Sequence, residues 1–370
     1  GDFDVTLPES ESSIAYLLFT SGSTGQPKGV MVAHRNIHQF LEVMQNRYSL
    51  TEHDRFSQMF ELVFDLSLFD IFMAWKAGGC LCCPTPEQAL MPTQYINDSR
   101  ITVWFSVPSL AVLMMRLRQL EAGAFPSLRL SLFCGEAMIV EAIDAWSKAA
   151  NHSIVENLYG PTEVTLACTL YRWEGEESRA DCLNGLVPIG LPYDGMHATI
   201  VDEQMKPVTA GSVGELLMSG PQVALGYWQD EEKTRQAFVK FEQSDTVYYR
   251  TGDLVRQPSP NSPIQYIGRL DNQVKIHGMR IELGEIEAAV KDASGLPQAV
   301  AIGWPVTDNG FGGIAVFLEG YTEDTHNISE ELKIKLPGYM IPKIIRVVDR
   351  YPLNANGKID RKALAKLLEN

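Results

Sequence analysis

One decapeptide gathers several groups that could bind a phosphate. Residues 20–29 read Thr-Ser-Gly-Ser-Thr-Gly-Gln-Pro-Lys-Gly and follow an apolar run at residues 14–19. Glycines let the backbone turn and bring its N–H groups close to an anion, hydroxyls donate to phosphate oxygens, and Lys28 supplies positive charge. The segment differs from the P-loop, which ends in Gly-Lys-Ser/Thr, because Pro27 precedes the lysine and Gly29 follows it. A flexible surface loop is the alternative, and the apolar run in front of the segment argues against it.

A second group of polar residues lies in the heptapeptide Asn-Leu-Tyr-Gly-Pro-Thr-Glu, which ends at Glu163. Tyr159 offers a flat face for a purine, and the Asn157 amide can both donate and accept hydrogen bonds. Thr162 can donate to a phosphate or carboxylate oxygen. Glu163 is a hard oxygen ligand suited to Mg²⁺. Taken alone, the Tyr-Gly-Pro tripeptide also fits a plain turn.

Three charged residues have two interpretations each. Asp65 stands in the apolar stretch 62–66, where an unpaired carboxylate is costly, and it is either a binding group or a helix N-cap. Asp253 follows a Thr-Gly turn and is either a ligand for two ribose hydroxyls or a solvated turn residue. Lys358 in an Asn-Gly-Lys turn is either a catalytic cation or a surface lysine.

Other candidate ligands are weaker. His34 and His38 have one-turn spacing, but Arg35 replaces the glutamate of the metalloprotease motif and no third ligand follows, so we interpret both as structural. The cysteines at positions 80, 82 and 83 lie in an apolar run and are expected to be buried thiols in a reducing compartment.

Alternation of strands and helices predicts an α/β fold with a parallel sheet covered by helices. Short β-branched runs separated by Gly and Pro turns then predict a β-rich subdomain over residues 186–268. A smaller α/β domain follows, which places the domains at 1–270 and 271–370. The expected strands lie at 14–19, 80–83, 101–105, 130–134, 154–158, 299–304 and 312–318, and the expected helices at 30–48, 66–77, 109–122, 138–149, 284–292 and 328–336.

Composition narrows the class of protein. A chain of 370 residues exceeds one small domain, and 31 Lys and Arg against 46 Asp and Glu give a net charge of −15. So acidic a chain is a poor non-specific binder of nucleic acid or of an anionic membrane. The sequence has neither an uncharged apolar run of membrane-spanning length nor a signal-like N-terminus, and we expect a cytoplasmic protein.

Seven segments, in this order, resemble the motifs of adenylate-forming enzymes, the superfamily of acyl-CoA ligases, luciferases and adenylation domains of nonribosomal peptide synthetases. The resemblance implies a large domain that binds ATP and substrate and a small mobile lid. The first of the seven segments starts close to the N-terminus, so the N-terminal part of the family fold is expected to be missing. The segments are 20–29, 64–70, 157–163, 214–216 with 226–227, 249–253, 268–275 and 354–360.

The resemblance also assigns roles to individual positions. It implies ATP and Mg²⁺, with Lys358, Thr162 and Glu163 as catalytic residues, Glu163 as the metal ligand and Asp271 as the hinge. His277 and Met279 stand where Arg and an aromatic residue are more usual. The implied ATP-binding residues are Thr20, Ser21, Gly22, Ser23, Thr24, Gly25, Lys28, Gly135, Glu136, Ala137, Asn157, Tyr159, Gly160, Thr162, Asp253, Arg269 and Lys358.

Asp65 places the chain in the branch that activates amino acids, because the matching aspartate in that branch pairs with the substrate ammonium. The other implied pocket residues are apolar or nearly so, which favours a small apolar amino acid. The set resembles the pockets of free-standing prolyl-AMP ligases, which favours L-proline. These pocket residues are Leu66, Phe69, Phe105, Leu132, Cys134, Leu158, Leu166 and Ala167.

The implied reaction forms aminoacyl-AMP from ATP and then transfers the acyl group to the phosphopantetheine thiol of a carrier protein, in secondary-metabolite (antibiotic) biosynthesis. An acyl-CoA ligase for a small carboxylic acid and a non-catalytic nucleotide-binding module are the alternatives.

Overall fold

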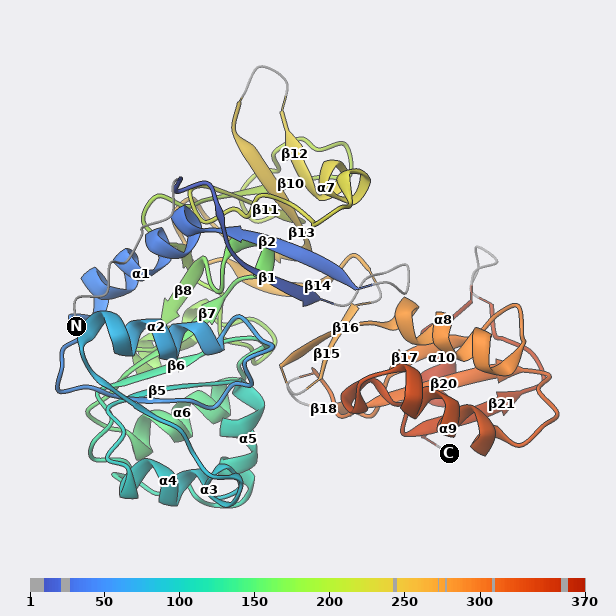
Figure 1. Cartoon of the computed structure of the whole chain (residues 1–370), viewed down its shortest axis with the longest axis horizontal. Coiled ribbons are helices and arrows are strands. Elements are labelled where there is room, and N and C mark those ends of the chain that lie inside the picture. Colours follow the sequence, from blue (N-terminus) through green and yellow to red (C-terminus); the bar gives the residue numbers. More distant parts are fainter. Residues whose placement is uncertain are drawn as a thin grey trace, which may run out of the picture. The chain divides into compact units, whose positions relative to one another are not determined.

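The computed structural model describes residues 10–20, 27–241, 245–271, 273–276, 278–307, 310–353 and 359–369. The chain divides into two compact units (Figure 1). Gly1–Phe19 and Gly29–Leu270 form the first, whereas Thr20–Lys28 and Asp271–Asn370 form the second, so the expected domains 1–270 and 271–370 differ from these units at residues 20–28. Each unit is described by itself below.

A seven-stranded sheet forms the centre of the first unit, in the order β4-β3-β5-β6-β7-β8-β9. The strands from β4 to β7 pair in parallel, as expected, whereas β8 and β9 add an antiparallel edge. The strands are β3 (Arg55–Ser57), β4 (Cys80–Cys82), β5 (Val103–Ser106), β6 (Leu130–Phe133), β7 (Ile154–Tyr159), β8 (Thr169–Arg172) and β9 (Leu191–Pro192).

Helices cover both faces of this sheet, and Figure 1 shows α2 on one side and α5 and α6 on the other. The strands are apolar on both faces, so successive side chains enter different cores. Trp104 and Phe133 pack with Trp146 of α6, whereas Phe105 and Leu132 belong to the core that faces α1 and α2. The helices are α1 (His34–Tyr48), α2 (Ser67–Ala77), α3 (Pro86–Ala89), α4 (Pro92–Asp98), α5 (Pro108–Arg116) and α6 (Val140–Ala149).

The β-rich subdomain is an antiparallel sheet in the order β10-β11-β13-β12, with β14 paired to β13. A short helix, α7 (Glu231–Ala237), precedes β12, and β1 (Ile14–Thr20) pairs with β2 (Lys28–Ala33). The sheet strands are β10 (His197–Val201), β11 (Val213–Ser219), β12 (Phe238–Lys240), β13 (Val247–Arg256) and β14 (Gln265–Arg269).

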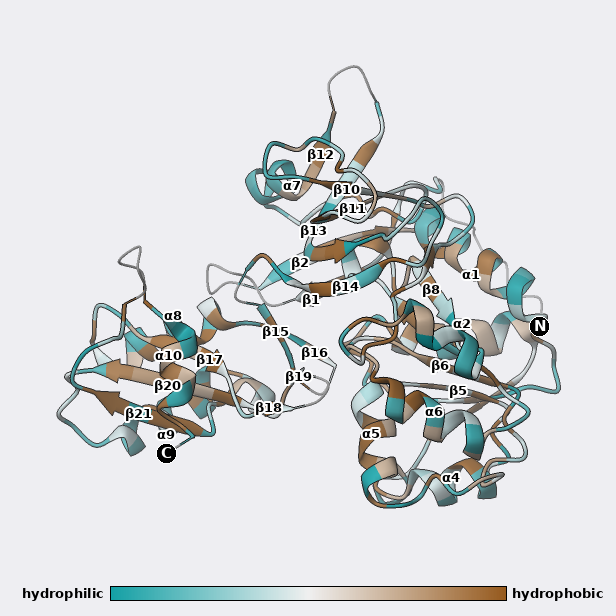
Figure 2. Ribbon diagram, turned by 180° about the vertical axis from the view of Figure 1, so that it is seen from behind, coloured by the Kyte–Doolittle hydropathy of each residue, from teal (hydrophilic) through white to brown (hydrophobic). Residues whose placement is uncertain are grey.

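The second unit contains a three-stranded sheet, β17-β20-β21, and two hairpins, β15-β16 and β18-β19. Strand β20 is strongly apolar in Figure 2 and is buried in the core of this unit. The elements are β15 (Gln273–Ile276), β16 (Met279–Glu282), β17 (Val300–Gly303), β18 (Val306–Thr307), β19 (Gly310–Phe311), β20 (Ile314–Glu319), β21 (Ile344–Val348), α8 (Leu283–Ser294), α9 (Thr325–Lys335) and α10 (Arg361–Lys366).

Three expectations were wrong in detail. The helix expected over 109–122 is α5, which ends at Arg116. The helix expected from Val30 begins at His34, because residues 30–33 complete β2, and Val30 bridges to Tyr227. Of the three clustered cysteines, Cys82 is buried but Cys80 and Cys83 are exposed. Strand β4 is an edge of the sheet, Cys80 is its first residue and Cys83 lies beyond its end, so an apolar run there need not be buried throughout.

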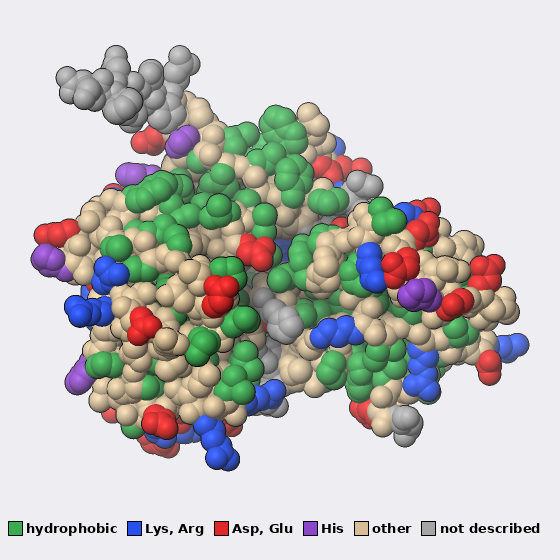
Figure 3. Space-filling view, turned by 60° about the horizontal axis from the view of Figure 1, so that its bottom comes forward, with side chains coloured by type: hydrophobic (Ala, Val, Ile, Leu, Met, Phe, Trp, Pro, Cys, Tyr) green, Lys and Arg blue, Asp and Glu red, His purple; other side chains and the backbone are tan. Residues whose placement is uncertain are grey.

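Acidic and basic side chains are interspersed on the face drawn in Figure 3, without an extended basic area among the residues described there. Within the part of the chain that the structure describes, no helix has both the length and the apolar character needed to cross a membrane.

Candidate active site

Two segments of predicted site residues, and Asp65, follow the carboxyl ends of parallel strands in the first unit. The segment 134–137 comes directly after β6, and residues 160–163 come directly after β7. Asp65 lies in the connection that leaves β3 and enters α2. The carboxyl ends of parallel strands meet at one edge of the sheet, which is where open α/β sheets bind ligands.

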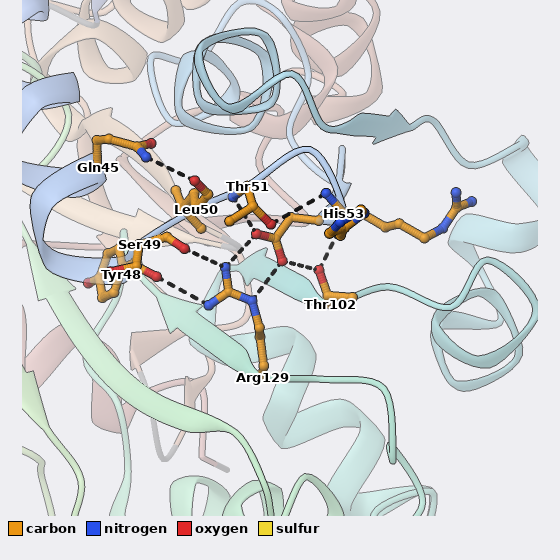
Figure 4. Close-up of polar contacts among 10 residues, drawn as sticks. Gln45, Tyr48, Ser49, Leu50, Thr51, His53, Thr102 and Arg129 are labelled. Carbon is orange, nitrogen blue, oxygen red and sulfur yellow. Dashed lines mark hydrogen bonds and ion pairs between the residues drawn. The ribbon is translucent and has the colours of Figure 1, made fainter.

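The opposite edge is held by an ion-pair cluster (Figure 4). Arg129 precedes β6 and Asp54 precedes β3, and the Arg129 Nε donates to Asp54 Oδ1 over 2.7 Å. The guanidinium also donates to the carbonyl oxygens of Tyr48 and Ser49 at the end of α1. Thr102 Oγ1 donates to the same carboxylate over 2.8 Å. The cluster therefore fixes the amino ends of β3 and β6 to α1, away from the candidate site.

Tyr159, Asp253 and Arg269 form a connected group on the nucleotide side of the predicted site. The Tyr159 hydroxyl donates to Asp253 Oδ2 over 2.5 Å, and Arg269 Nη1 donates to Asp253 Oδ1 over 2.7 Å. Asp253 and Arg269 are direct partners in the pairing of β13 with β14. Burial, with the Asp253 carboxylate next in effect, holds the pKa of Tyr159 well above its ordinary value. The hydroxyl therefore remains a hydrogen-bond donor, and the ring is fixed at the end of β7.

Glu163 is fully buried in a short 3-10 turn, Thr162–Val164. The Tyr227 hydroxyl donates to its Oε1 over 2.8 Å, and Ala224 N–H donates to its carbonyl oxygen over 3.0 Å. Tyr227 in turn bridges to Val30, close to the predicted phosphate loop in sequence. Tyr227 lies in one of the seven motifs, but the sequence predicted no role for it. Its partner Glu163 is 64 residues away, and only the fold brings the two together.

Asp65 is buried, at 8% exposure, and its Oδ2 has no hydrogen-bond partner among the described residues. Burial raises the pKa of its carboxyl to about 6; an interaction with the Thr162 side chain lowers it, and the Glu163 carboxylate raises it further. The backbone at Leu66 and Leu166 also interacts with this carboxyl and lowers its pKa.

These surroundings distinguish the two interpretations of Asp65. The N-cap position of α2 is occupied by Leu66, and no side chain caps the first turn. The carboxyl instead faces the loop that follows β7. Its Oδ2 therefore lacks a hydrogen-bond partner among the described residues at the edge of an apolar cluster, and a cationic group bound there would supply one.

The apolar pocket residues predicted from sequence all belong to one buried cluster on the α1 and α2 face of the sheet. Phe69 and Phe105 meet edge to face with ring centroids 5.0 Å apart. The cluster contains Leu66, Phe69, Phe105, Leu132, Cys134, Leu158, Leu166 and Ala167.

The loop after Glu163 has an uncommon backbone. Thr165 and Leu166 both have positive φ, at 59° and 65°, a region that side chains other than glycine rarely adopt. Gly160 lies against this loop, and a Cβ on it would fall 2.5 Å from Ala167 Cα. The glycine of the Tyr-Gly-Pro motif is therefore required by the close approach of two backbone segments.

Asn157 and Glu136 are anchored at the same edge. Asn157 Nδ2 donates to the carbonyl of Pro188 over 2.9 Å, while its Oδ1 has no partner within the described ranges. Glu136 accepts the N–H of Ser109 over 2.8 Å, at the first turn of α5. N–H groups in the first turn of a helix have no partner within the helix, and the Glu136 carboxylate accepts one of them. Glu136 therefore stabilises the start of α5, in addition to any role in binding ATP. Its neighbours Gly135, with φ of 98°, and Ala137 are half-buried.

Several predicted residues cannot be placed. Ser21, Gly22, Ser23, Thr24, Gly25 and Lys358 lie outside the described residues. Thr20 is the last residue of β1, Lys28 is the first residue of β2, and Asp271 is the first residue after the boundary between the two units.

A magnesium ion fits the donor set that the structure shows. Mg²⁺ is commonly held by one or two carboxylates together with substrate phosphates. Glu163 offers such a carboxylate, aligned by Tyr227, and no group of three or more His, Cys, Asp or Glu capable of holding a metal occurs among the residues described.

Comparison with known proteins gives consistent matches. The family described as AMP-binding enzyme matches residues 3–228. Tyrocidine synthase 3 of Brevibacillus parabrevis is 36% identical over 366 residues, which are 96% of this chain and 5% of that protein. Zwittermicin A synthase ZmaJ of Bacillus cereus is 35% identical over 367 residues, which are 96% of this chain and 68% of that protein. The chain thus spans a small part of the first relative and about two thirds of the second.

Solved structures agree with the sequence matches. The adenylation domain AlmE of Vibrio cholerae, solved in complex with glycyl-adenosine-5'-phosphate, has a TM-score of 0.89 and 33% identity, covering 99% of this chain and 68% of that chain. Holo-PA1221, a nonribosomal peptide synthetase protein containing adenylation and PCP domains and bound to a vinylsulfonamide inhibitor, has a TM-score of 0.82 and 25% identity, covering 99% of this chain and 62% of that chain.

Proposed function

Because the chain belongs to the family of AMP-binding enzymes, we propose that it activates an α-amino acid as an aminoacyl adenylate and passes the acyl group to the thiol of a carrier protein. The observation that carries this proposal is Asp65, a buried carboxyl whose Oδ2 has no partner among the described residues, beside an apolar cluster. An ammonium bound there supplies the missing partner, whereas a carboxylic acid without an amino group leaves the acid unsatisfied.

In the proposed first step, the amino-acid carboxylate attacks the α-phosphate of ATP and pyrophosphate leaves. Tyr159 lies along the purine, and Asp253 accepts the ribose hydroxyls while Arg269 holds the carboxylate in place. Bound Mg²⁺ would neutralise phosphate charge, with Glu163 as its protein ligand. Thr162 donates to the substrate oxygens, and the Lys358 ammonium stabilises charge that develops at the α-phosphate.

In the proposed second step, a phosphopantetheine thiol attacks the acyl carbon and AMP leaves. Residues 1–270 hold ATP and amino acid, residues 271–370 act as a lid, and Asp271 is the hinge between half-reactions. The use of ATP and a carrier protein fits a cytoplasmic reaction in secondary metabolism, and the names of the matched synthetases support that context.

We further propose L-proline as the amino acid. The predicted pocket residues other than Asp65 are buried within one apolar cluster, so no side chain there satisfies a polar substrate group. Burying such a group without a partner costs about 1–3 kcal/mol, which disfavours polar amino acids. The two phenylalanines, Phe69 and Phe105, disfavour large aromatic substrates by their volume.

Exchange of labelled pyrophosphate into ATP tests both proposals. We expect exchange with L-proline at least tenfold above valine, leucine and isoleucine. A rate with another α-amino acid that lies within tenfold of the rate with L-proline, or above it, would overturn the proline assignment alone. Exchange supported by an unaminated acid and by no amino acid would favour an acyl-CoA ligase, and nucleotide binding without any exchange would favour a non-catalytic module.

A further inference from the structure

A buried glutamine outside the recognised motifs holds the strained loop beside Asp65. Gln222 is fully buried, and its Nε2 donates to the carbonyl of Ala167 over 2.7 Å. The same nitrogen lies 3.2 Å from the carbonyl oxygen of Thr165 and 3.3 Å from that of Val164. In the other direction, Thr165 Oγ1 donates to the Gln222 carbonyl oxygen over 2.7 Å. One amide thus bonds the backbone on both sides of Leu166.

The loop needs such support because its backbone is unfavourable. Thr165 and Leu166 are consecutive residues with positive φ, an unfavourable backbone conformation that persists only where its surroundings hold it in place. Gln222 and the close approach of Gly160 are the surroundings that the structure shows. Without the amide, the carbonyls of Val164, Thr165 and Ala167 lose their shared donor in a buried setting.

The same loop faces the proposed substrate. Leu166 and Ala167 belong to the predicted pocket residues, and the backbone at Leu166 interacts with the Asp65 carboxyl. A change in this loop would therefore move both the apolar wall and a neighbour of the ammonium-binding acid. The nucleotide-side residues Tyr159, Asp253 and Arg269 form their own connected group.

We propose that Gln222 is a positioning residue that fixes the 165–167 loop and thereby sets amino-acid affinity and discrimination, which rests on the function proposed above. It touches no substrate in this role. It acts through the backbone of the loop, so its effect is expected on the amino acid and not on ATP.

The segment that carries Gln222 is anchored by a second buried amide, that of Asn36, so the Gln222 side chain is not needed to anchor it. Asn36 of α1 donates to the carbonyls of Pro221 and Val223, over 2.6 and 2.9 Å. These bonds already hold the segment on both sides of Gln222. The Gln222 side chain extends from that anchored segment to the loop, so its donor bonds serve the loop.

The test replaces Gln222 with methionine, which has a similar size and shape but no donor. In pyrophosphate exchange, Gln222→Met is expected to raise the KM for L-proline at least tenfold, leave the KM for ATP within twofold, and reduce the preference for L-proline over valine and leucine. Gln265→Met is the matched control. Gln265 is a buried glutamine of β14 whose Nε2 donates to the Asp181 carbonyl over 2.7 Å, and it lies outside the proposed site.

The results separate the two proposals. If the wild-type protein exchanges pyrophosphate and Gln222→Met behaves as Gln265→Met does, with unchanged discrimination and equal KM values, the role of Gln222 is wrong while the proposed function stands. If wild-type protein supports no exchange with any amino acid, the proposed function is wrong and the role of Gln222 falls with it.

A second variant covers the case in which Gln222→Met does not fold. Thr165→Val keeps the side-chain shape but removes the bond from Oγ1 to Gln222. It is expected to raise the KM for L-proline threefold or more without changing that for ATP. Where both single variants fold, the double variant should show less than the product of the two effects, because both remove bonds that join residue 222 to the same loop. An unchanged KM for L-proline in Thr165→Val would overturn the proposal.

Discussion

At the scale of single residues, Asp65 combines a functional and a stability role. Its pKa of about 6 lies above that of an ordinary carboxyl, near 3.9, because the side chain is buried. The folded protein therefore binds a proton that the unfolded chain has lost, and folding stability falls as the pH rises from about 4 to about 6. Above that range the Asp65 carboxylate is ionised and buried, which lowers folding stability, and a bound ammonium offsets this loss.

Asp65→Asn is accordingly expected to abolish amino-acid-dependent exchange. It should also raise the free energy of unfolding at pH 8 by about 1–3 kcal/mol, because a pKa raised by about two units corresponds to about 3 kcal/mol. In the wild type, the KM for the amino acid should rise as the pH falls below about 6. Urea unfolding at pH 8 and pH 5, together with exchange kinetics, checks both statements.

The matched control is Asp70→Asn. Asp70 is fully buried in α2, neither of its carboxylate oxygens has a partner among the described residues, and burial raises its pKa well above the ordinary value. This variant should share the gain in stability at pH 8 but keep the KM for the amino acid. Equal loss of exchange in both variants would mean that Asp65 has no special relation to the substrate.

Lys358 is the second residue with a specific expectation. Its charge is useful where the transition state gains negative charge at the α-phosphate, and that happens only in adenylate formation. Lys358→Ala should lower pyrophosphate exchange by at least a thousandfold but leave thiol transfer from preformed adenylate nearly intact. Lys362→Ala, at an exposed lysine of α10, is the control for a surface charge. Exchange within tenfold of the wild type would return Lys358 to the class of surface lysines.

At the scale of elements, the two edges of the central seven-stranded sheet have different roles, one in the chemistry of the site and one in stability. Its carboxyl edge carries the candidate site, and its amino edge is fixed by Arg129 and Asp54. Burial raises the pKa of Asp54, but hydrogen bonds, first that from Arg129, outweigh it and hold the pKa below the ordinary value. This stabilising contribution is present at neutral pH and is lost as the pH falls below about 4.

Arg129→Met should therefore destabilise the first unit by about 2 kcal/mol at pH 7, because it leaves the buried Asp54 carboxylate without its ion-pair partner. The KM values for ATP and amino acid should not change at temperatures where the variant is folded. Urea unfolding and exchange kinetics measure the two effects.

Arg172→Met provides the comparison, since Glu156 keeps Arg47 and Tyr48 as partners when Arg172 is lost. It should cost less than about 1 kcal/mol. Equal losses in the two variants, or a changed KM in Arg129→Met, would contradict the separation of the two edges.

At the scale of the whole molecule, the boundary between the two units falls at Leu270 and Asp271. A hinge absorbs backbone rotation at a few positions. Asp271→Pro fixes φ and is expected to impair one half-reaction at least tenfold more than the other, measured as exchange and as thiol loading. Asp271→Ala, which keeps backbone freedom, should leave both steps within a few-fold of the wild type. Equal loss of both steps in Asp271→Pro would contradict the hinge.

Local patterns were sufficient to predict most of the elements. Apolar runs and turn residues indicated the central strands and the helices α2, α5 and α6, since burial on both faces leaves a direct mark in the sequence. The exceptions are elements whose character depends on partners. Residues 30–33 became a strand through pairing with β1 and the bridge to Tyr227, and β8 and β9 run antiparallel because of how the chain returns to the sheet.

The sequence by itself indicated the class of chemistry through the resemblance of its ordered motifs, such as 157–163, to those of adenylate-forming enzymes, because each motif lies within a few consecutive residues. Only the tertiary structure decided how those side chains are held. The bond from Tyr227 to Glu163 spans 64 residues, and the bonds from Gln222 to the 164–167 loop span 55 to 58. Contacts between residues so far apart in the sequence leave no mark in a local pattern. The acceptors of Gln222 leave none either, because every residue has a backbone carbonyl. The buried state of Asp65 is likewise a property of everything packed around it.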